Sequence, residues 1–171
     1  RKNLREEIPC ESFIERFENQ TISAVFRRGK YIILQTKKGF GIIHLGMTGV
    51  LAVESCDEVL PPHTHLYANI SGTTMRLRFS DPRRFGRIGT VENLEDCHWL
   101  SDLGPEPLGD IRLSKHLETL GARRKCPVKN FIMDARVVVG VGNIYASESL
   151  FDSGVSPLRP CHTLSSKEWS K

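Results

Sequence analysis

The sequence predicts an α+β protein, in which an antiparallel β-sandwich domain is followed by a small helical domain. Between residues 21 and 91, short segments rich in β-branched and aromatic residues alternate with turn residues, as is typical of a sandwich or barrel. Beyond residue 112, apolar residues recur at helical spacing instead. Residues 104–108 (Gly-Pro-Glu-Pro-Leu) form a stiff, turn-rich connector. We therefore place the two predicted domains at residues 1–104 and 105–171.

The β-rich domain begins with a predicted amphipathic helix, because Phe13, Ile14 and Phe17 recur at helical spacing within residues 11–17. Hairpin turns are expected at residues 37–39 and 71–73, each of which contains a glycine. A loop is expected at residues 59–64, around two consecutive prolines. The predicted strands cover residues 21–27, 31–36, 40–45, 50–53, 65–70, 74–79 and 88–91.

The helical domain is predicted to contain helices at residues 113–120, 128–133 and 143–151. Before the third helix, an apolar run stops at Gly140 and Gly142, and Asn143 is expected to act as the N-cap. Glycines allow a close approach to the backbone, and the free N–H groups of a helix start suit a phosphate. A tight turn between two packed helices would explain the same residues.

The charge pattern is more informative than the net charge of +4, which demands no polyanionic partner. Five arginines lie between Arg76 and Arg87 against a single acid, Asp81, and residues 123–125 form a second basic cluster. Such clusters are usually solvated surface, but two of them beside a possible phosphate turn favour a nucleic acid. No apolar run approaches the ~18 residues of a membrane span, and no signal peptide opens the chain.

The five cysteines predict neither a zinc site nor a disulfide framework, because no Cys-x-x-Cys pair occurs. We interpret them as ordinary packing residues in a reducing cytosol. They are Cys10, Cys56, Cys97, Cys126 and Cys161.

Both ends of the sequence indicate a piece of a longer protein. The chain opens on Arg1 without an initiator Met, and Ser165 with Glu168 forms a capping box just before the sequence stops. Too few residues follow to make a stable helix. We therefore expect the chain to be incomplete at both ends.

Two predicted loops carry side chains that could enter a base stack. Residues 80–86 (Ser-Asp-Pro-Arg-Arg-Phe-Gly) combine two arginines with an aromatic residue. Arginine can pair with an orphaned base, and phenylalanine can wedge between base steps. Met47 stands between Gly46 and Gly49, and its flexible side chain can fill a vacated space. The alternative is that Phe85 and Met47 are buried in the core and that the arginines are solvated.

His63 and His65, at i and i+2, could in principle bind a metal, but no third ligand lies nearby in the sequence.

These motifs together resemble the formamidopyrimidine-DNA glycosylases and the related endonuclease VIII group, over residues 27 to 157. The motifs at residues 44–49 (His-Leu-Gly-Met-Thr-Gly) and 81–86 (Asp-Pro-Arg-Arg-Phe-Gly) are nearer the glycosylase version. The other matching strings are residues 27–31 (Arg-Arg-Gly-Lys-Tyr), 129–134 (Lys-Asn-Phe-Ile-Met-Asp) and 140–148 (Gly-Val-Gly-Asn-Ile-Tyr-Ala-Ser-Glu).

The resemblance implies a helix–two-turn–helix DNA-binding domain at residues 105–171 and a role for each matching residue. It makes Lys30 catalytic, as a lysine that binds phosphate beside the lesion and assists elimination. Arg83 would face the estranged base, with Phe85 as the wedge and Met47 as a further void-filling residue. The remaining DNA contacts implied by the family are His63, Arg124, Lys129, Gly142 and Asn143.

The resemblance also implies a function in DNA repair. The protein would be a bifunctional DNA glycosylase and AP lyase that flips and removes oxidised purines, such as 8-oxoguanine and formamidopyrimidines, from damaged double-stranded DNA. It would then nick the abasic strand by β,δ-elimination. We expect a bacterial, cytoplasmic and nucleoid-associated monomer without a membrane partner.

Three parts of the family pattern do not occur among these residues: the N-terminal proline nucleophile with its glutamate, the four-cysteine zinc finger and the loop that covers the flipped base. A terminal amine is partly neutral at working pH and can form a Schiff base with the sugar. Zinc is thus expected from the resemblance, with its ligands outside this chain. The alternatives are a catalytically inactive relative that only binds DNA, or a protein that binds structured RNA.

Overall fold

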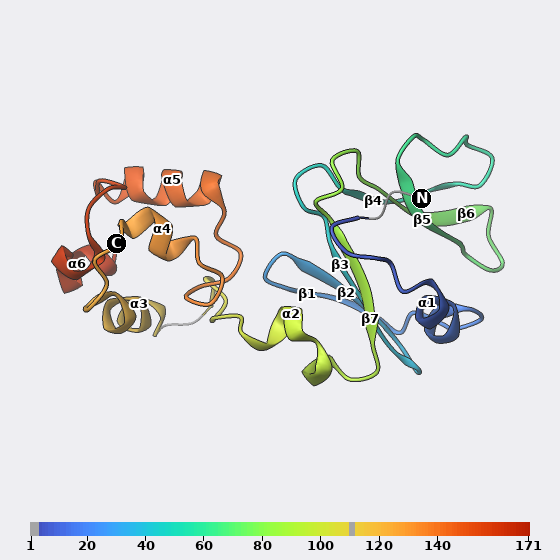
Figure 1. Cartoon of the computed structure of the whole chain (residues 1–171), viewed down its shortest axis with the longest axis horizontal. Coiled ribbons are helices and arrows are strands. Elements are labelled where there is room, and N and C mark those ends of the chain that lie inside the picture. The colour runs from blue at the N-terminus through green and yellow to red at the C-terminus, as the bar shows by residue number, and fades with distance from the viewer. Residues whose placement is uncertain (1–3, 110–111) are drawn as a thin grey trace. The chain divides into compact units, whose positions relative to one another are not determined.

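The structure is a computed structural model that describes residues 4–109 and 112–171 (Figure 1). The chain divides into two compact units, Arg1–Asp96 and Cys97–Lys171. The strands belong to the first unit, and most of the helices belong to the second (Figure 1). The predicted α+β class, with a β-rich part followed by a helical part, is confirmed. The division falls at Asp96, ahead of the connector at residues 104–108.

Two antiparallel sheets form the first unit. One sheet has the order β1-β2-β3-β7, and the other has the order β4-β6-β5. The strands of the first sheet are β1 (Ala24–Arg28), β2 (Tyr31–Thr36), β3 (Gly39–His44) and β7 (Arg87–Val91). The strands of the second sheet are β4 (Val50–Ser55), β5 (Thr64–Asn69) and β6 (Met75–Ser80).

The two sheets share one core, as a sandwich requires. Leu34, Ile43 and Ile88 come from the first sheet, Phe79 comes from the second, and Phe13 comes from α1 (Cys10–Phe17). Ile43 and Phe79 are completely buried. Full burial of side chains of this size contributes about 1.5–3 kcal/mol each, so this cluster holds the sheets together.

The strand register brings four connecting segments to one end of the sandwich. Tyr31 pairs with His44, and His44 pairs with Arg87, so the β1–β2 turn lies beside the end of β3 and the start of β7. Val50 and Thr64 both pair with Ser80, at the end of β6. Residues 29–30, 45–49, 63–64 and 81–86 therefore gather at this end.

Helices of the second unit pack around a separate apolar cluster. They are α3 (Leu113–Gly121), α4 (Val128–Ile132), α5 (Asn143–Asp152) and the short α6 (Ser166–Trp169). Their core centres on side chains such as Val128, Phe131, Ala146 and Leu150, with Trp169 packed against it.

The capping box predicted at Ser165 is confirmed. The Ser165 backbone N–H donates to the Glu168 carboxylate at 2.8 Å, and Arg159 pairs with the same carboxylate. Hydrogen bonds from the Ser165 backbone and hydroxyl, followed by the contact with Arg159, lower the pKa of Glu168 to about 2. The first turn of α6 is thus held by an ionised carboxylate.

The differences from the predicted elements lie at their ends and in very short pieces. β1 begins at Ala24 rather than at residue 21. The short helices η1 (Leu94–Asp96), α2 (His98–Ser101) and η2 (Cys161–Thr163) were not predicted, because three or four residues are too few to display a period.

Two further observations concern the predictions from composition. The packing interpretation of the cysteines is wrong for Cys10 and Cys126, which are exposed. Within residues 4–109 and 112–171, no helix combines the length and the apolar character that crossing a membrane requires.

Candidate nucleic-acid interface

The loop after β6 is organised by Asp81, a carboxylate with no exposed surface. Its Oδ1 accepts a hydrogen bond from the Thr48 hydroxyl at 2.6 Å, and its Oδ2 accepts one from the Gly86 backbone N–H at 2.7 Å. The Asp81 backbone N–H donates to the His63 carbonyl at 3.0 Å, and the His65 ring lies 3.0 Å from the Asp81 carbonyl. One residue thus connects three of the four segments at this end of the sandwich.

Opposing effects act on the pKa of Asp81. Burial raises it, but hydrogen bonds from Thr48 and from the backbone of Gly86, Arg83 and Arg84 outweigh burial and hold the pKa below its ordinary value. The carboxylate therefore stays ionised, and each of its oxygens keeps its donors. A buried charge satisfied in this way holds the loop in one conformation.

Gly46 brings the Met47 loop against the Phe85 loop. Its backbone adopts φ +63°, and an added Cβ would lie 2.6 Å from both the Phe85 carbonyl carbon and the Gly86 nitrogen. Only glycine fits this approach. Met47 is 69% exposed and Phe85 is 44% exposed, so the alternative that both are buried in the core is wrong.

Arg83 and Phe85 form a stacked pair on the second of these loops. The guanidinium carbon of Arg83 lies 4.8 Å from the centre of the Phe85 ring, within cation–π range. The intervening Arg84 has φ +60°, a left-handed conformation that non-glycine residues seldom adopt. The loop thus presents a cation and an aromatic face together at the molecular surface.

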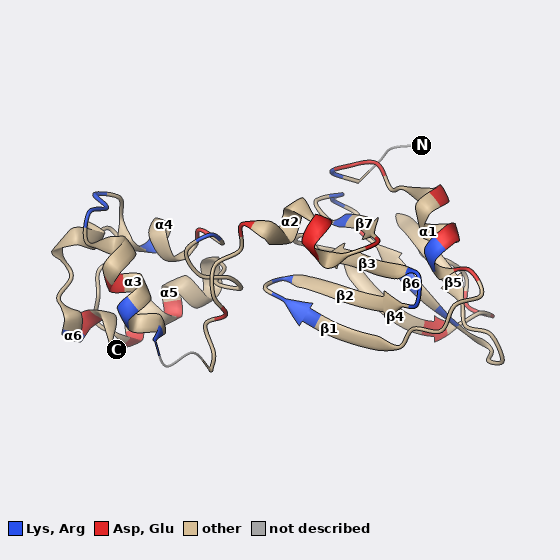
Figure 2. Cartoon of the chain, turned by 90° about the horizontal axis from the view of Figure 1, so that it is seen from below, with Lys and Arg blue, Asp and Glu red and all other residues tan. Residues whose placement is uncertain are grey.

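Positive charge gathers at the same end of the sheet. Lys30 is exposed in the two-residue β1–β2 turn, and the adjoining end of β1 is basic (Figure 2). Burial, followed by the charges of Arg87, Lys30 and Arg5, lowers the pKa of His44 from its ordinary value. Besides burial, the lowered pKa reflects the positive charges around the imidazole. Because these charges attract negative groups, this end of the sandwich suits an anion.

His63 is exposed immediately before β5, and its backbone adopts φ +64°. Its carbonyl, rather than its ring, is the group held by Asp81. The ring is consequently available at the surface on a backbone that Asp81 fixes.

The interpretation of all five arginines of residues 76–87 as one basic patch needs correction. Arg76 and Arg78 both pair with Glu54, at 2.8 Å and 2.6 Å, and all three side chains are nearly buried. Arg87 lies 3.2 Å from Glu6. Of the five, only Arg83 is exposed, and Arg84 is half-buried. The candidate interface therefore rests on fewer charges than the sequence indicated.

The second unit contains the glycine turn, which we define as residues 140–142 before α5. Gly140 has φ +80°, and Gly142 is the N-cap of α5, with an extended backbone and no side-chain cap hydrogen bond. The prediction that Asn143 is the N-cap is wrong, because Asn143 is the first residue of the helix. No side chain of the cap residue occupies the first N–H groups, so the helix start retains donors for an anion.

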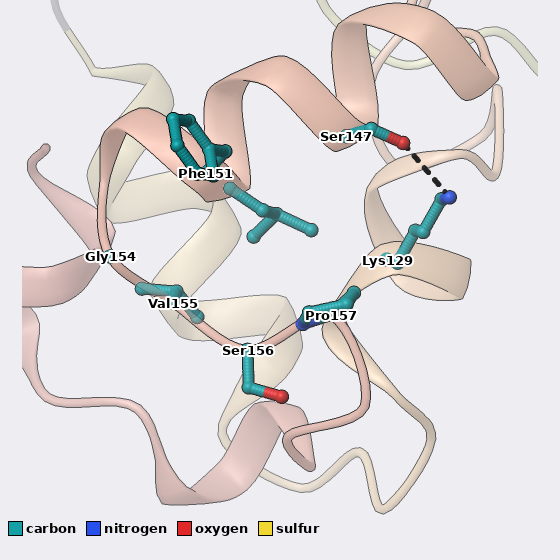
Figure 3. A pocket seen from close by; sticks show the side chains of 8 residues that line it. Lys129, Ser147, Phe151, Gly154, Val155, Ser156 and Pro157 are labelled. Atoms are coloured by element: carbon teal, nitrogen blue, oxygen red, sulfur yellow. Dashed lines mark hydrogen bonds between the residues drawn. The ribbon is translucent and has the colours of Figure 1, made fainter.

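Lys129 extends from α4 to Ser147 on α5 (Figure 3). Its ammonium group donates to the Ser147 hydroxyl at 3.0 Å, and that hydroxyl donates to the Asn143 carbonyl at 2.9 Å. Lys129 and Ser147 also line a pocket of about 440 Å³ together with residues 154–157. Lys129 and Asn143, both predicted DNA contacts, thus lie on one side of the second unit.

Arg124 lies in the exposed segment before α4. The His162 backbone N–H donates to the Arg124 carbonyl at 3.1 Å, which fixes the backbone beneath an exposed side chain. No contact in the described residues joins Arg124 to Lys129 or Asn143, so its place in one DNA-contacting surface stays a prediction.

Three contributors were not identified from the sequence. They are Asp81, Thr48 and Ser147, which lie inside the matching motifs but were not predicted to be contacts. Each has a polar side chain inside a matching motif, which was the available signal, but the partner of a hydroxyl or a carboxylate depends on tertiary structure. The described residues do not form a zinc site, because residues 4–109 and 112–171 contain no group of three potential metal-ligating side chains.

Two sequence-family models match the chain. One, described as the formamidopyrimidine-DNA glycosylase N-terminal domain, covers residues 1–88, and the other, described as the formamidopyrimidine-DNA glycosylase H2TH domain, covers residues 103–171. A β-sandwich followed by a helical unit with a glycine turn defines the class of proteins that join these two domains. The chain belongs to the formamidopyrimidine-DNA glycosylase family.

Curated relatives agree with this assignment. The formamidopyrimidine-DNA glycosylases of Saccharophagus degradans and Vibrio cholerae are 43% and 44% identical to the chain over 169 and 166 residues. These alignments cover 98% and 97% of this chain and 61% of each relative. The chain therefore spans about three fifths of the length of these relatives.

Solved structures share the fold. Lactococcus lactis formamidopyrimidine-DNA glycosylase, non-covalently bound to DNA containing an AP site, superposes with a TM-score of 0.86 over 94% of this chain and 61% of that chain, at 24% identity. The MutM (Fpg) protein of Thermus thermophilus gives a TM-score of 0.78 at 34% identity, over 92% and 60% of the two chains. The first likeness concerns the fold alone.

Proposed function

We propose that the chain is the DNA-gripping part of a base-excision repair enzyme that removes oxidised purines from duplex DNA. The observation that carries this proposal is the pair of loops joined by Thr48 and Asp81, which presents Met47, Arg83 and Phe85 at one surface. Exposing three such side chains on a braced loop pair serves no packing purpose in the first unit. Their chemistry suits a gap in a base stack.

In this proposal the three side chains replace a flipped nucleotide. Flipping a base out of a duplex costs a few kcal/mol. Phe85 wedges between base steps, Arg83 faces the estranged base and Met47 fills the space left behind. Together they offset part of the cost of flipping, and 8-oxoguanine and formamidopyrimidines are the proposed substrates.

The remaining cations and donors bind the phosphate backbone. Lys129, Gly142 and Asn143 hold phosphate at the start of α5, where free N–H groups favour an anion. His63 and Arg124 add further contacts. We assign Lys30 to the phosphate beside the lesion, where its ammonium group assists the β,δ-elimination that nicks the abasic strand.

The proposal includes a nucleophile and a zinc finger only because the chain belongs to this family. Zinc would have a structural role, and no step proposed for these residues depends on it. The complete protein is proposed to act as a monomeric glycosylase and AP lyase in the bacterial cytoplasm, in association with the nucleoid.

The first prediction tests the loop pair directly. In the complete protein, Phe85→Ala should weaken binding to a duplex containing 8-oxoguanine by about tenfold or more, since losing one aromatic–base stack costs about 1–3 kcal/mol. Fluorescence anisotropy measures binding, and gel analysis of the nicked strand measures excision. Tyr67→Ala is the matched control, because Tyr67 is an aromatic residue that is also exposed, on β5.

Equal affinity and equal excision rates for Phe85→Ala and the wild type would refute the proposal. Borohydride trapping separates the enzyme from an inactive relative, because only an amine that forms a Schiff base gives a covalent adduct. Lesion binding without an adduct would leave the DNA-binding surface standing and reject the catalytic part.

A further inference from the structure

Two thiols of the second unit face each other across a short antiparallel pairing. The Sγ atoms of Cys126 and Cys161 lie 4.0 Å apart, although the residues are 35 positions apart in the chain. Pro127 and Pro160 form an isolated antiparallel bridge between them. Cys126 and Cys161 are the next pair outward in that register.

Backbone hydrogen bonds hold this pairing on both sides. The Cys161 N–H donates to the Cys126 carbonyl at 3.1 Å, and the Val128 N–H donates to the Arg159 carbonyl at 2.8 Å. The Cys161–Cys126 bond is one of the two that such an antiparallel pair exchanges, and the Cα separation in a hydrogen-bonded pair is about 5.5 Å. Disulfides favour a Cα separation of about 5.5–6 Å, so the backbone is already suitable for one.

Accessibility divides the two thiols into an attacking and a resolving residue. Cys126 is exposed, whereas Cys161 is completely buried. Burial, followed by the charge and hydrogen bond of Cys126, raises the pKa of Cys161 to about 12. Cys161 is thus protonated at neutral pH, and an oxidant arriving from solvent meets Cys126 first.

We propose that Cys126 and Cys161 form a reversible intramolecular disulfide with a low-molecular-weight disulfide, such as glutathione disulfide, as the oxidant. The Cys126 thiolate attacks one glutathione sulfur, the oxidant's S–S bond breaks, and one glutathione thiolate leaves. Cys161 then loses its proton, attacks the Cys126 sulfur and displaces the second glutathione thiolate. The two cysteine protons end on the two glutathione thiols, so one disulfide is reduced as the other forms.

The loop closed by this bond contains α4, the glycine turn and α5. Lys129 and Asn143 therefore both lie within the closed loop. A disulfide restricts the unfolded chain more when it closes a longer loop. Oxidation would therefore stabilise the second unit, and the bond needs no partner chain or metal.

The experiment treats the full chain with dithiothreitol and then with excess glutathione disulfide, and maps the thiols by peptide mass spectrometry. We expect a peptide that links Cys126 to Cys161 and disappears again on reduction. Cys126→Ser should abolish the link, and Cys161→Ala should trap glutathione on Cys126. A Cys10→Ser variant is the control, because Cys10 is also exposed and should leave the link unchanged.

Stability provides the second measurement. Both tryptophans, Trp99 and Trp169, lie in the second unit, so their fluorescence follows its unfolding. The oxidised wild type should melt roughly 5–15 °C above the reduced protein, whereas Cys126→Ser should melt equally in both buffers. Wild-type protein that keeps glutathione on Cys126 with Cys161 free, or that keeps both thiols reduced, would overturn the proposal. Cys126→Ser alters an exposed side chain, so the test stands even if Cys161→Ala does not fold.

Discussion

At the scale of single residues, the main device is a buried carboxylate that serves neighbouring loops. Asp81 receives hydrogen bonds from Thr48 and Gly86, so the Met47 and Phe85 loops share one anchor. Because these donors keep the charge satisfied, burial of Asp81 fixes the loops instead of destabilising them.

Asp81→Asn tests this anchor. The amide would set its NH₂ group against the Gly86 N–H or the Arg83 N–H, and the unsatisfied donor should cost about 1–3 kcal/mol at pH 7. The folded pKa of Asp81 is depressed, so its contribution is present above the ordinary value near 3.8 and is lost as pH falls below it. Denaturation of the wild type, followed by circular dichroism, should show this acid loss, and Asp81→Asn should show less of it.

Asp57→Asn is the matched control, because Asp57 is exposed and should leave both the stability at pH 7 and the acid loss unchanged. Equal acid profiles for Asp81→Asn and the wild type would contradict the role of the ionised carboxylate.

In the loop at residues 81–86, exposure follows from sequence, but the hydrogen-bond partners do not. The loop predicted at residues 80–86 is present between β6 and β7, and Arg83 and Phe85 are exposed on it, as their predicted role requires. The hydrogen bond from Gly86 to Oδ2 depends on the left-handed backbone of Arg84, at φ +60°. The turn preferences of an arginine do not predict this conformation. The assignment of Arg76 and Arg78 to a basic patch was wrong for a similar reason, since their partner Glu54 is on another strand.

At the scale of elements, α4 and α5 are joined through a hydroxyl. Lys129 reaches Ser147, and Ser147 reaches the Asn143 carbonyl, so the cation lies beside the helix start. The ammonium group has three N–H donors, and one of them is engaged by Ser147. The others remain for an anion.

Lys129→Gln tests this arrangement through salt. Removal of one phosphate contact should weaken duplex binding to a similar degree for every sequence, and should reduce the slope of log affinity against log salt by about 1. Anisotropy titrations over a salt series measure the slope. Lys115→Gln on α3 is the control, because Lys115 is exposed and pairs with Glu118. A slope for Lys129→Gln equal to that of the wild type would remove Lys129 from the proposed interface.

The glycine turn marks the limit of prediction for elements. Its place and the helix that follows were predicted correctly, since an apolar run that ends at two glycines has few other meanings. The N-cap was misplaced by one residue, because Gly and Asn are both favoured there and helix ends are the least certain feature of a pattern.

At the scale of the whole chain, two separate cores support two units. Phe79 and Ile43 centre the first, and Val128 and Ala146 centre the second. The order of the units followed from the change of period in the sequence, from strand-like to helical. The functional prediction for the two units depended on sequence motifs that match a family, because composition and charge fit many classes of protein.

Glu54→Gln tests the independence of the two cores. The change leaves Arg76 and Arg78 nearly buried without their carboxylate, so the first unit should unfold several degrees earlier. Hydrogen exchange in β4 and β6 should report this loss. Tryptophan fluorescence, which reports the second unit, should keep its wild-type midpoint.

Glu58→Gln is the control, because only the Glu58 backbone carbonyl accepts from Arg76 and the substitution keeps that carbonyl. A parallel fall of the fluorescence midpoint in Glu54→Gln would show that the two units unfold as one.

The stack of Arg83 on Phe85 has a consequence for how this surface is altered. A guanidinium that rests on a ring is positioned by that ring, so truncating the phenylalanine also releases the cation. The two side chains act as one unit, which presents a cation and an aromatic ring together. The losses caused by Arg83→Ala and Phe85→Ala should therefore overlap instead of adding, and any redesign of this loop has to exchange both residues together.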